Sequence, residues 1–525
     1  MRRHAQTPGA GYDAKALEAS ERARARSLLE MLSEAHVDFR EGVDPELLKR
    51  ANDLISSIDA KANRLMGLEA PPTKDQAAEL QKQIDELQAQ YQQLEVKIRQ
   101  TSPRYAALTQ PQPLSLHEIQ QTLDGDTTLL EYALGSEHSY LWAVTASGLN
   151  SYQLPNRTEI ERSVRKVYEE VTARSTYPRN ELPDQRQARV AQADADLPKS
   201  AQELSAMLLG SAAHELNRKR LVIVADGALQ HVPFAMLPIT NENGQSQPLV
   251  VTHEIVGLPS ASTVAVLRQE LQNRAPAPRI LAVLADPVFD ANDPRVKVKP
   301  STIAAHPAAL SDNARILEHL SENGSLLTAA RMVIPRLPYT RQEAERILQA
   351  APKGTTFEAL DFQANLSTAT SPELGNYRYL HFATHGYLDS EHPQLSAIVL
   401  SLVDPQGNPV PGFLRASDIY NLKLPADLIV LSACQTGLGK EIRGEGIVGL
   451  TRGFMYAGAA RVDVSLWSVN DKATEQLMAI FYEKLLKQGM SPSASLRQAQ
   501  VEMFKSRQWS NPYYWAAFVQ QGEWK

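Results

Sequence analysis

Two apolar runs decide the fold of this 525-residue chain: YRYLHFATHG (residues 377–386) and DLIVLSACQTG (residues 427–437). In each run the apolar residues are mostly consecutive, not alternating with polar ones, and a glycine-containing turn follows. Such runs indicate strands buried on both faces, which is typical of a parallel sheet covered by helices. His385 follows the first strand and Cys434 follows the second, so the two strand ends carry reactive side chains.

Further runs of the same kind indicate that the chain alternates strand and helix from about residue 220 onward. They are RLVIVAD (220–226), RILAVLADP (279–287), SAIVLSLVD (396–404) and RVDVSLWSV (461–469). Before them, TLLEYALG (128–135) and SYLWAVTAS (139–147) are typical of an antiparallel pair. The pattern predicts an α/β protein with a three-layer α/β/α sandwich and a mostly parallel sheet.

The first hundred residues predict helices. Segments 44–65 and 73–98 are expected to form an antiparallel helical hairpin, because apolar residues recur in each at spacings of three and four. In the second segment this spacing is a coiled-coil seam made by Leu80, Ile84, Leu87, Tyr91, Leu94 and Ile98. An earlier helix after Asp13 carries a stripe of small residues, which we expect to pack on another helix: Ala16, Ala19, Ala23, Ser27 and Met31.

Two other segments lack a periodic apolar pattern. The polar, arginine-rich stretch 173–198 is expected to be a mobile loop, and residues 290–330 are expected to be an insertion or lid.

Composition excludes several classes of function. Lys and Arg number 54 and Asp and Glu number 60, so the net charge is −6, which argues against nucleic acid as a partner. No run of 18 apolar residues predicts a membrane span, and the N-terminus lacks the apolar stretch of a secretory signal. Cys434 is the sole cysteine, which excludes an internal disulfide and a multi-cysteine metal site and fits a reducing, cytoplasmic location.

The two strand ends predict a nucleophilic site. Neighbouring strands of a sheet are about 4.8 Å apart. If these two strands are neighbours, Cys434 and His385 therefore lie close together at one edge of the sheet. A histidine can take the thiol proton and later protonate a leaving amine, which points to acyl transfer from a peptide bond. The N–H groups of Gly386 and Cys434 are candidates for an oxyanion hole. The structural alternatives are a buried apolar cysteine and a hydrogen-bonded histidine at a strand end.

Two other patterns in this region are weaker. GEGIVG (444–449) satisfies a nucleotide-binding spacing, but it stands ten residues after Cys434, and Glu445 would repel phosphate. The pair His381 and His385 has the spacing of a zinc site, but its segment is predicted to be a strand and lacks the adjoining glutamate. We therefore expect no metal and no cofactor.

Long segments of the chain resemble the CHAT-domain family of caspase- and separase-like cysteine peptidases. The resemblance extends over about residues 110–525 and rests on HFATHGYLD (381–389), residues 431–474, NPYYWAAFVQQGEW (511–524), residues 220–238 and residues 334–347. It implies that the histidine of HFATHG, here His385, and the cysteine of SACxTG, here Cys434, are catalytic. The family often carries TPR repeats before this domain, and residues 16–32 resemble the last helix of such an array.

The resemblance also implies a division of the chain. Residues 1–105 are expected to be a helical region, residues 111–270 a non-catalytic caspase-like half, and residues 271–525 the catalytic half. Asp226 and Asp286, which end two strands, are expected to be turn formers or caps and not members of a catalytic triad.

Substrate contacts are expected from the segment after residues 461–469. In separase-like relatives an aspartate here is associated with a P1 arginine, which implies that Asp471 binds a basic P1 side chain. The alternative is that Asp471 caps the following helix. Trp467 either lines the same pocket or packs in the core.

The sequence therefore predicts a cysteine endopeptidase that cleaves protein substrates. Its N-terminal helices are candidates for binding a protein partner or a second copy of the chain. The alternative is a catalytically silent scaffold that binds a peptide and recruits partners through its helical arm.

Overall fold

The architecture of the chain was taken from a computed structural model. It describes residues 1–525 except for 2–3, 5, 8–9, 37–45, 48, 51–52, 55–56, 59–60, 62–73, 102–113, 179–180, 241–243, 273, 298–333, 388–395, 420–421, 433, 436–449, 452 and 456. The expected lid therefore lies largely outside the described residues, and GEGIVG lies entirely outside them.

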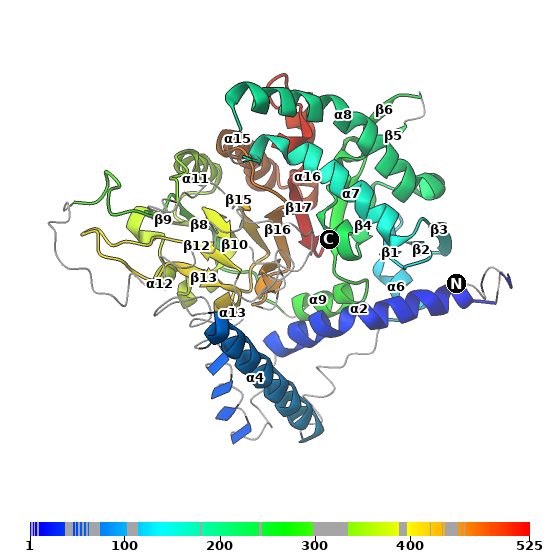
Figure 1. Ribbon diagram of the computed structural model, residues 1–525, viewed down its shortest axis with the longest axis horizontal. Helices are drawn as coiled ribbons and strands as arrows, with labels where there is room; N and C mark the ends of the chain where they lie inside the picture. Colours follow the sequence, from blue (N-terminus) through cyan, green and yellow to red (C-terminus); the bar gives the residue numbers. More distant parts are fainter. Residues whose placement is uncertain are drawn as a thin grey trace.

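One sheet of 11 strands forms the centre of the molecule (Figure 1). Its order across the sheet is β3 (Gly148–Leu154), β2 (Ser139–Thr145), β1 (Thr127–Ala133), β4 (Arg220–Val224), β7 (Glu254–Leu258), β17 (Phe518–Gly522), β16 (Arg461–Ser465), β14 (Leu428–Leu431), β10 (Tyr377–Ala383), β8 (Arg279–Ala285) and β9 (Thr356–Leu360). The α/β fold with a mostly parallel sheet is confirmed, as is the antiparallel pair β1–β2.

The sheet consists of two parallel blocks that run in opposite directions. Strands β1, β4, β7 and β17 are parallel to one another, and so are β16, β14, β10, β8 and β9. The blocks meet where β17 pairs antiparallel with β16. The C-terminal strand thus joins the two expected halves in one sheet, and we call this junction the seam.

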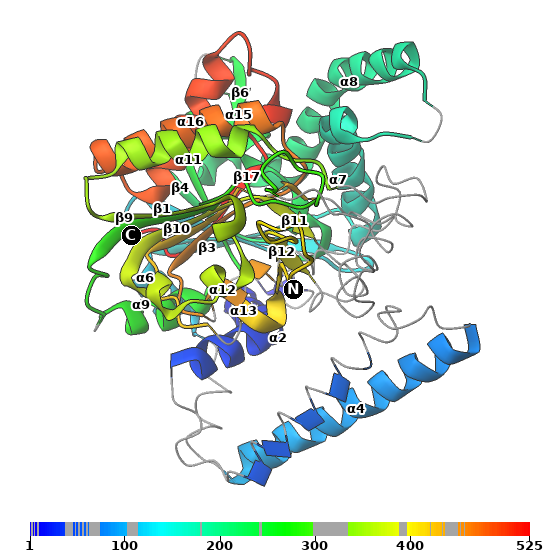
Figure 2. The ribbon, with the colours of Figure 1, turned by 90° about the vertical axis from the view of Figure 1, so that its left-hand side faces the viewer.

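Helices cover both faces of the sheet, which gives three layers. Figure 2 shows α11 (Tyr339–Ala350), α15 (Asp471–Tyr482) and α16 (Pro492–Lys505) on one side and α9 (Thr263–Gln272) with α2 (Tyr12–His36) on the other. Apolar side chains from sheet and helices form one large buried cluster under α11, α15 and α16 and two on the opposite side, because strands that are covered on both faces have no solvated face.

The segment that we expected to be a mobile loop is largely helical. Helix α8 (Pro183–Leu209) begins with Pro183 at its first turn and packs on α7 (Arg157–Thr172). Its buried residues recur at spacings of four, three and four: Leu197, Ala201, Leu204 and Leu208. The prediction was wrong because the polar first turns hid this stripe, which begins only at residue 197.

Helix α2 packs on the sheet domain through a face other than the predicted one. Ala19 and Ala23 of the small-residue stripe are exposed, whereas Leu17 and Glu21 are fully buried. The Glu21 carboxylate accepts hydrogen bonds from the backbone N–H groups of Ala261 and Ser262, at 2.9 and 2.7 Å, just before α9. Glu21 therefore provides the unpaired N–H groups at the start of α9 with an acceptor.

The second arm of the expected hairpin is helix α4 (Lys74–Thr101). Ile84 and Leu94 of its predicted seam are buried. Most of the first arm lies outside the described residues, but Lys61 donates a hydrogen bond to Gln83 of α4 at 2.7 Å.

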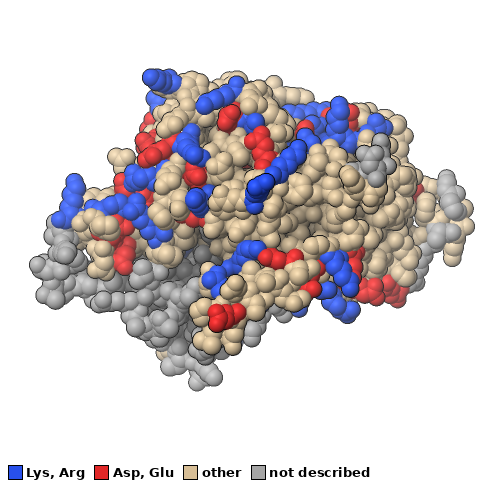
Figure 3. Space-filling model, turned by 90° about the horizontal axis from the view of Figure 1, so that it is seen from above, with Lys and Arg blue, Asp and Glu red and all other residues tan. Residues whose placement is uncertain are grey.

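Charges are mixed on the surface seen in Figure 3, where Lys and Arg alternate with Asp and Glu. This mixture agrees with the small net charge of −6. Among the described residues, no helix is both long and apolar enough to cross a bilayer.

Replacing Glu21 with alanine should destabilise the domain, because it leaves two buried N–H groups without an acceptor. We expect a loss of about 1–3 kcal/mol, measured as a lower thermal midpoint of the full chain. Arg22→Ala, one residue further on the exposed face of α2, is the control and should have little effect. Equal midpoints for the two variants would contradict this role of Glu21.

Candidate functional site

The backbone brings His385 and Cys434 together at one edge of the sheet. Strand β10 continues into β11 (His385–Tyr387), and its parallel neighbour β14 continues into β15 (Cys434–Gln435). In the small four-stranded sheet that these extensions form, His385 is the direct partner of Cys434 and Gly386 is the partner of Gln435. The side chain of Cys434 lies outside the described part of the structure.

The His385 ring is buried and held in one tautomer. Its Nε2 lies 2.7 Å from the carbonyl oxygen of Pro335, and the ring packs on Phe289 with centroids 5.4 Å apart. A carbonyl only accepts, so Nε2 carries the proton and Nδ1 has a free lone pair. Burial lowers the pKa of His385, which favours the neutral ring. Among the described residues, nothing hydrogen-bonds Nδ1.

The carbonyl that holds His385 is itself anchored by an ion cluster. Arg336, next to Pro335, makes two hydrogen bonds to Asp286, at 2.8 and 2.7 Å. Arg341 and Arg295 also bind Asp286, at 2.8 and 3.0 Å. Asp286 is 1% exposed and directly follows β8, the neighbour of β10. Three guanidinium groups thus meet one buried carboxylate beside the histidine.

Asp286 also has an unusual backbone. Its φ is +48°, in the left-handed region that non-glycine residues other than Asn and Asp seldom adopt. Asp361 shares this feature, with φ at +52°, and binds Arg295 at 2.7 Å as well as Arg341. We expected Asp286 to be a turn former or cap, and its role as the anchor of residues 334–341 was missed. Two features of the sequence could have indicated this role. One is an acid directly after a strand, and the other is the set of arginines in segment 334–347, which resembles the family.

Asp471 lies at the same edge, at the start of α15. The helix is capped by Asn470, whose side chain accepts from the N–H of Ala473, so the alternative interpretation of Asp471 as the cap is wrong. Asp471 instead accepts a hydrogen bond from the N–H of Tyr339 at 3.0 Å. Burial, with smaller contributions from nearby carboxylates, raises its pKa to about 6.

Trp467 is part of the core. It is 1% exposed, its indole N–H donates to the carbonyl of Tyr513 at 3.1 Å, and its ring meets Tyr168 edge-on. This placement favours the packing alternative over a substrate contact.

His381 lies in the interior of the sheet. Its Nε2 lies 2.8 Å from the Glu343 carboxylate and its Nδ1 lies 3.1 Å from the hydroxyl of Tyr482. Both ring nitrogens are therefore engaged in protein hydrogen bonds, which fits the structural alternative for this histidine.

The Nε2–Pro335 bond can be tested by ¹⁵N NMR, with His385→Ala used to assign the signals. We predict a single Nε2–H tautomer of His385 at pH 7 and a pKa below 6.5. Because this pKa is lower in the folded state than in the unfolded state, the contribution of His385 to stability is present above pH 6.5 and declines as the pH falls below it. An Nδ1–H tautomer would contradict the prediction.

The anchor can be tested with a matched pair of variants. Asp286→Asn keeps a residue that tolerates positive φ but weakens the hold on Arg336, so we expect His385 to populate both tautomers. Asp361→Asn also removes a carboxylate at positive φ from this cluster, but Asp361 accepts its hydrogen bonds from Arg295 and Arg341. The control should lose stability but keep the single tautomer, and identical spectra for the two variants would refute the anchor.

Comparison with known proteins gives a family match over most of the sheet domain. A family model described as CHAT domain matches residues 198–523. Tetratricopeptide repeat protein 28 of Homo sapiens is 39% identical over 106 residues, which are 20% of this chain and 4% of that protein. Its Mus musculus counterpart is 40% identical over 106 residues, with the same coverage of 20% and 4%. The match to these relatives is thus confined to a small part of their length.

Solved structures show distant likenesses. The separase–securin complex of Saccharomyces cerevisiae matches with a TM-score of 0.45 and 10% identity, over 97% of this chain and 40% of that chain. The arginine-specific cysteine proteinase gingipain R matches with a TM-score of 0.34 and 9% identity, over 70% of this chain and 74% of that chain. At such low identities a likeness concerns the fold and not the activity.

Proposed function

Because the chain belongs to the CHAT-domain family, we propose that it is a cysteine endopeptidase that cleaves protein substrates through Cys434 and His385. The observation that carries the proposal is the backbone pairing of the two residues at the edge of the sheet. The second support is the tautomer of His385, because a ring protonated on Nε2 keeps a basic Nδ1 for the thiol proton.

In the proposed mechanism, Nδ1 of His385 takes the proton of the Cys434 thiol as sulfur attacks the peptide carbonyl carbon. The oxyanion that forms would accept hydrogen bonds from the N–H groups of Gly386 and Cys434. The imidazolium then donates this proton to the leaving amine as the C–N bond breaks, and a thioester remains. Water attacks the thioester with His385 as base, which releases the acid product and the thiol.

The Pro335 carbonyl has a defined task in this cycle. A positive charge develops on the His385 ring when Nδ1 is protonated, and the Nε2–H bond to a carbonyl oxygen strengthens as that charge grows. The same bond prevents rotation of the ring, so Nδ1 stays where it is in every step. Burial favours the neutral ring at rest, which suits His385 to act as a general base.

Asp471 is the proposed determinant of a basic P1 residue. A partly buried carboxylate at the carboxyl end of β16, on the edge that holds His385 and Cys434, can pair with Arg or Lys of a substrate. Its hydrogen bond from Tyr339 leaves a second carboxylate oxygen for this contact. Trp467 is left out of the proposed contact because it lies in the core.

The proposed setting is a reducing compartment such as the cytoplasm, where Cys434 stays a free thiol. The α2 helix is proposed as the last helix of a TPR-like array, and α4 with its partner arm as a surface for protein partners or self-association. No cofactor is part of the mechanism.

Profiling on a diverse peptide library tests the activity. We expect the wild type to cleave peptides and Cys434→Ala and His385→Ala to lose at least about a thousandfold in rate, since the nucleophile and base act as a unit. His138→Ala, an exposed histidine, is the control and should cleave normally. A wild type that binds peptides but cleaves none would favour the silent scaffold.

Asp471→Asn tests the P1 preference. We expect cleavage after Arg and Lys to fall about a hundredfold or more at pH 7, because a buried charge pair is lost. In the wild type this cleavage should decline as the pH falls through about 6, where Asp471 becomes protonated. Glu475→Gln, one turn along α15, is the matched control, since Glu475 pairs with Arg346 at 2.8 Å. Unchanged cleavage in Asp471→Asn would remove this residue from the pocket.

A further inference from the structure

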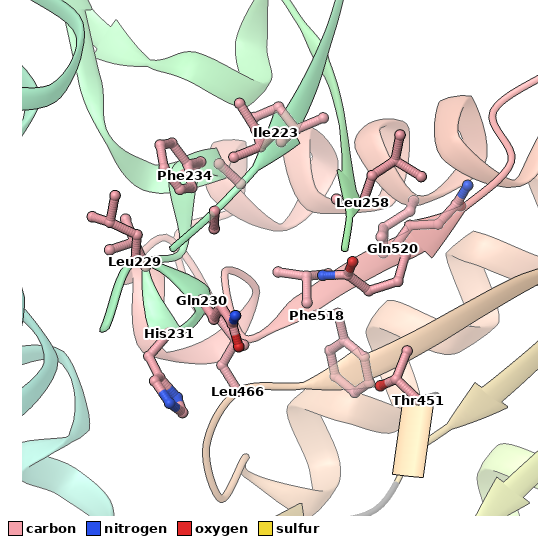
Figure 4. Close-up of a pocket in the computed structure, with 18 of the residues that line it drawn as sticks. Ile223, Leu229, Gln230, His231, Phe234, Leu258, Thr451, Leu466, Phe518 and Gln520 are labelled. Atoms are coloured by element: carbon pink, nitrogen blue, oxygen red, sulfur yellow. The ribbon is translucent and has the colours of Figure 1, made fainter. Parts of the chain in front are cut away.

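A cavity of about 100 Å³ lies at the seam of the sheet, away from His385 and Cys434. It is lined by residues of β4, β7 and β17, by the turn segment that follows β4, by α16, and by Thr451 and Leu466 (Figure 4). Its strand residues come from β4, β7 and β17, and Leu466, which directly follows β16, adds a contact from the other side of the seam. Junctions between structural halves are common places for small-molecule sites.

Several polar groups in this wall are buried and have no hydrogen-bond partner in the described part of the chain. Gln520 of β17 is 1% exposed, and neither its amide oxygen nor its amide nitrogen has a hydrogen-bond partner among the described residues. The hydroxyl of Thr451 and both ring nitrogens of His231 are in the same condition there. Buried polar groups are normally paired, because an unpaired one costs about 1–3 kcal/mol. Three such side chains around one cavity therefore point to something that binds there.

The rest of the wall is mostly apolar, apart from Gln230, Gln500 and Gln521. Its apolar residues include Ile223, Leu229, Phe234, Leu258 and Phe518, and the described residues that line the cavity include no Asp, Glu, Lys or Arg. Burial lowers the pKa of His231 to about 4, so this ring is neutral at pH 7. A charged ligand would lose its hydration without gaining a counter-charge, so the occupant is uncharged.

The volume limits the size of the occupant. A dry cavity of about 150 Å³ holds benzene, so this smaller one encloses about four non-hydrogen atoms, and a slightly larger molecule can extend through its open side. Water alone would bind the polar groups of Gln520 and Thr451 but leave the apolar walls without contacts. A molecule with an apolar body and a polar head satisfies both kinds of wall.

We propose that the seam cavity binds a small uncharged molecule with a short apolar body and an amide-like head that donates to and accepts from Gln520 and Thr451. The ligand would lie between β17 and the turn segment that follows β4. The proposal does not depend on peptidase activity, because neither His385 nor Cys434 lines the cavity.

Binding can be tested on the full chain with isobutyramide and isobutyrate, which have the same shape and size but differ in charge. We expect saturation-transfer NMR and calorimetry to detect isobutyramide, and isobutyrate at pH 7 to bind at least about tenfold more weakly. Binding of neither molecule, with ordered waters on Gln520 and Thr451 in a crystal structure, would overturn the proposal. Equal binding of both molecules would also overturn it.

Two variants test whether the ligand binds in the seam cavity. Gln520→Met keeps the length of the side chain but removes the amide, and Thr451→Val keeps the shape but removes the hydroxyl. Each should weaken isobutyramide about tenfold, the usual effect of one lost buried hydrogen bond. Gln498→Met is the matched control, because Gln498 lies on α16 but binds Glu502 instead of lining the cavity. Unchanged affinity in Gln520→Met would refute the site.

Folding of the variant separates a ligand site from a structural role. Without ligand, Gln520→Met removes two unpaired polar atoms, so its thermal midpoint should equal or exceed that of the wild type. A clearly lower midpoint would mean that the amide is paired within the protein, and this result would contradict the proposal.

Discussion

The hydrogen bond from Nε2 of His385 to the carbonyl of Pro335 governs what the edge of the sheet can do. It places the ring proton on Nε2 and leaves Nδ1 as the acceptor. Burial adds to this by favouring the neutral ring. A base that is neutral, oriented and shielded from water needs little reorganisation before it takes a proton, which is the condition that the proposed acyl transfer requires.

This bond depends in turn on a long-range contact. Pro335 lies a few residues before α11. Two carboxylates hold the chain from Arg336 to Arg341, which joins Pro335 to the first turn of that helix. Asp286 binds Arg336 and Arg341 from the end of β8, and Asp471 accepts from Tyr339 at the end of β16. Strands β8 and β16 flank the pair β10 and β14. The acids that follow these two flanking strands thus hold the segment whose Pro335 carbonyl orients His385. In this arrangement Asp471 has a structural contact in addition to its proposed contact with substrate.

The sequence predicted the sheet because its signal is local. Strands buried on both faces must be apolar on consecutive residues, and a residue that follows such a strand must lie at its carboxyl end. This reasoning brought His385 and Cys434 to one edge, where the backbone pairs them. Helix α8 was missed because its apolar stripe is confined to its second half, and the small-residue stripe of α2 was misleading because the buried face includes an acid, Glu21.

The anchor of His385 could not be predicted in the same way. Asp286 and Arg336 are 50 residues apart, and their pairing depends on how α11 docks beside β8. The left-handed backbone of Asp286 leaves no mark in the sequence, since aspartate is common in ordinary turns. The core position of Trp467 follows from packing against Tyr168, about 300 residues earlier in the chain, and spacing carries no information on such a contact.

The central claim is that the sole thiol exchanges a proton with His385. The most direct measurement is the pH dependence of alkylation by iodoacetamide, because Cys434 is the one residue that can be labelled as a thiol. The account predicts fast alkylation that persists at pH 6–7 in the wild type and, in His385→Ala, slow alkylation that follows an ordinary thiol with a pKa near about 8.5. Slow alkylation with the same ordinary pH dependence in both proteins would contradict it.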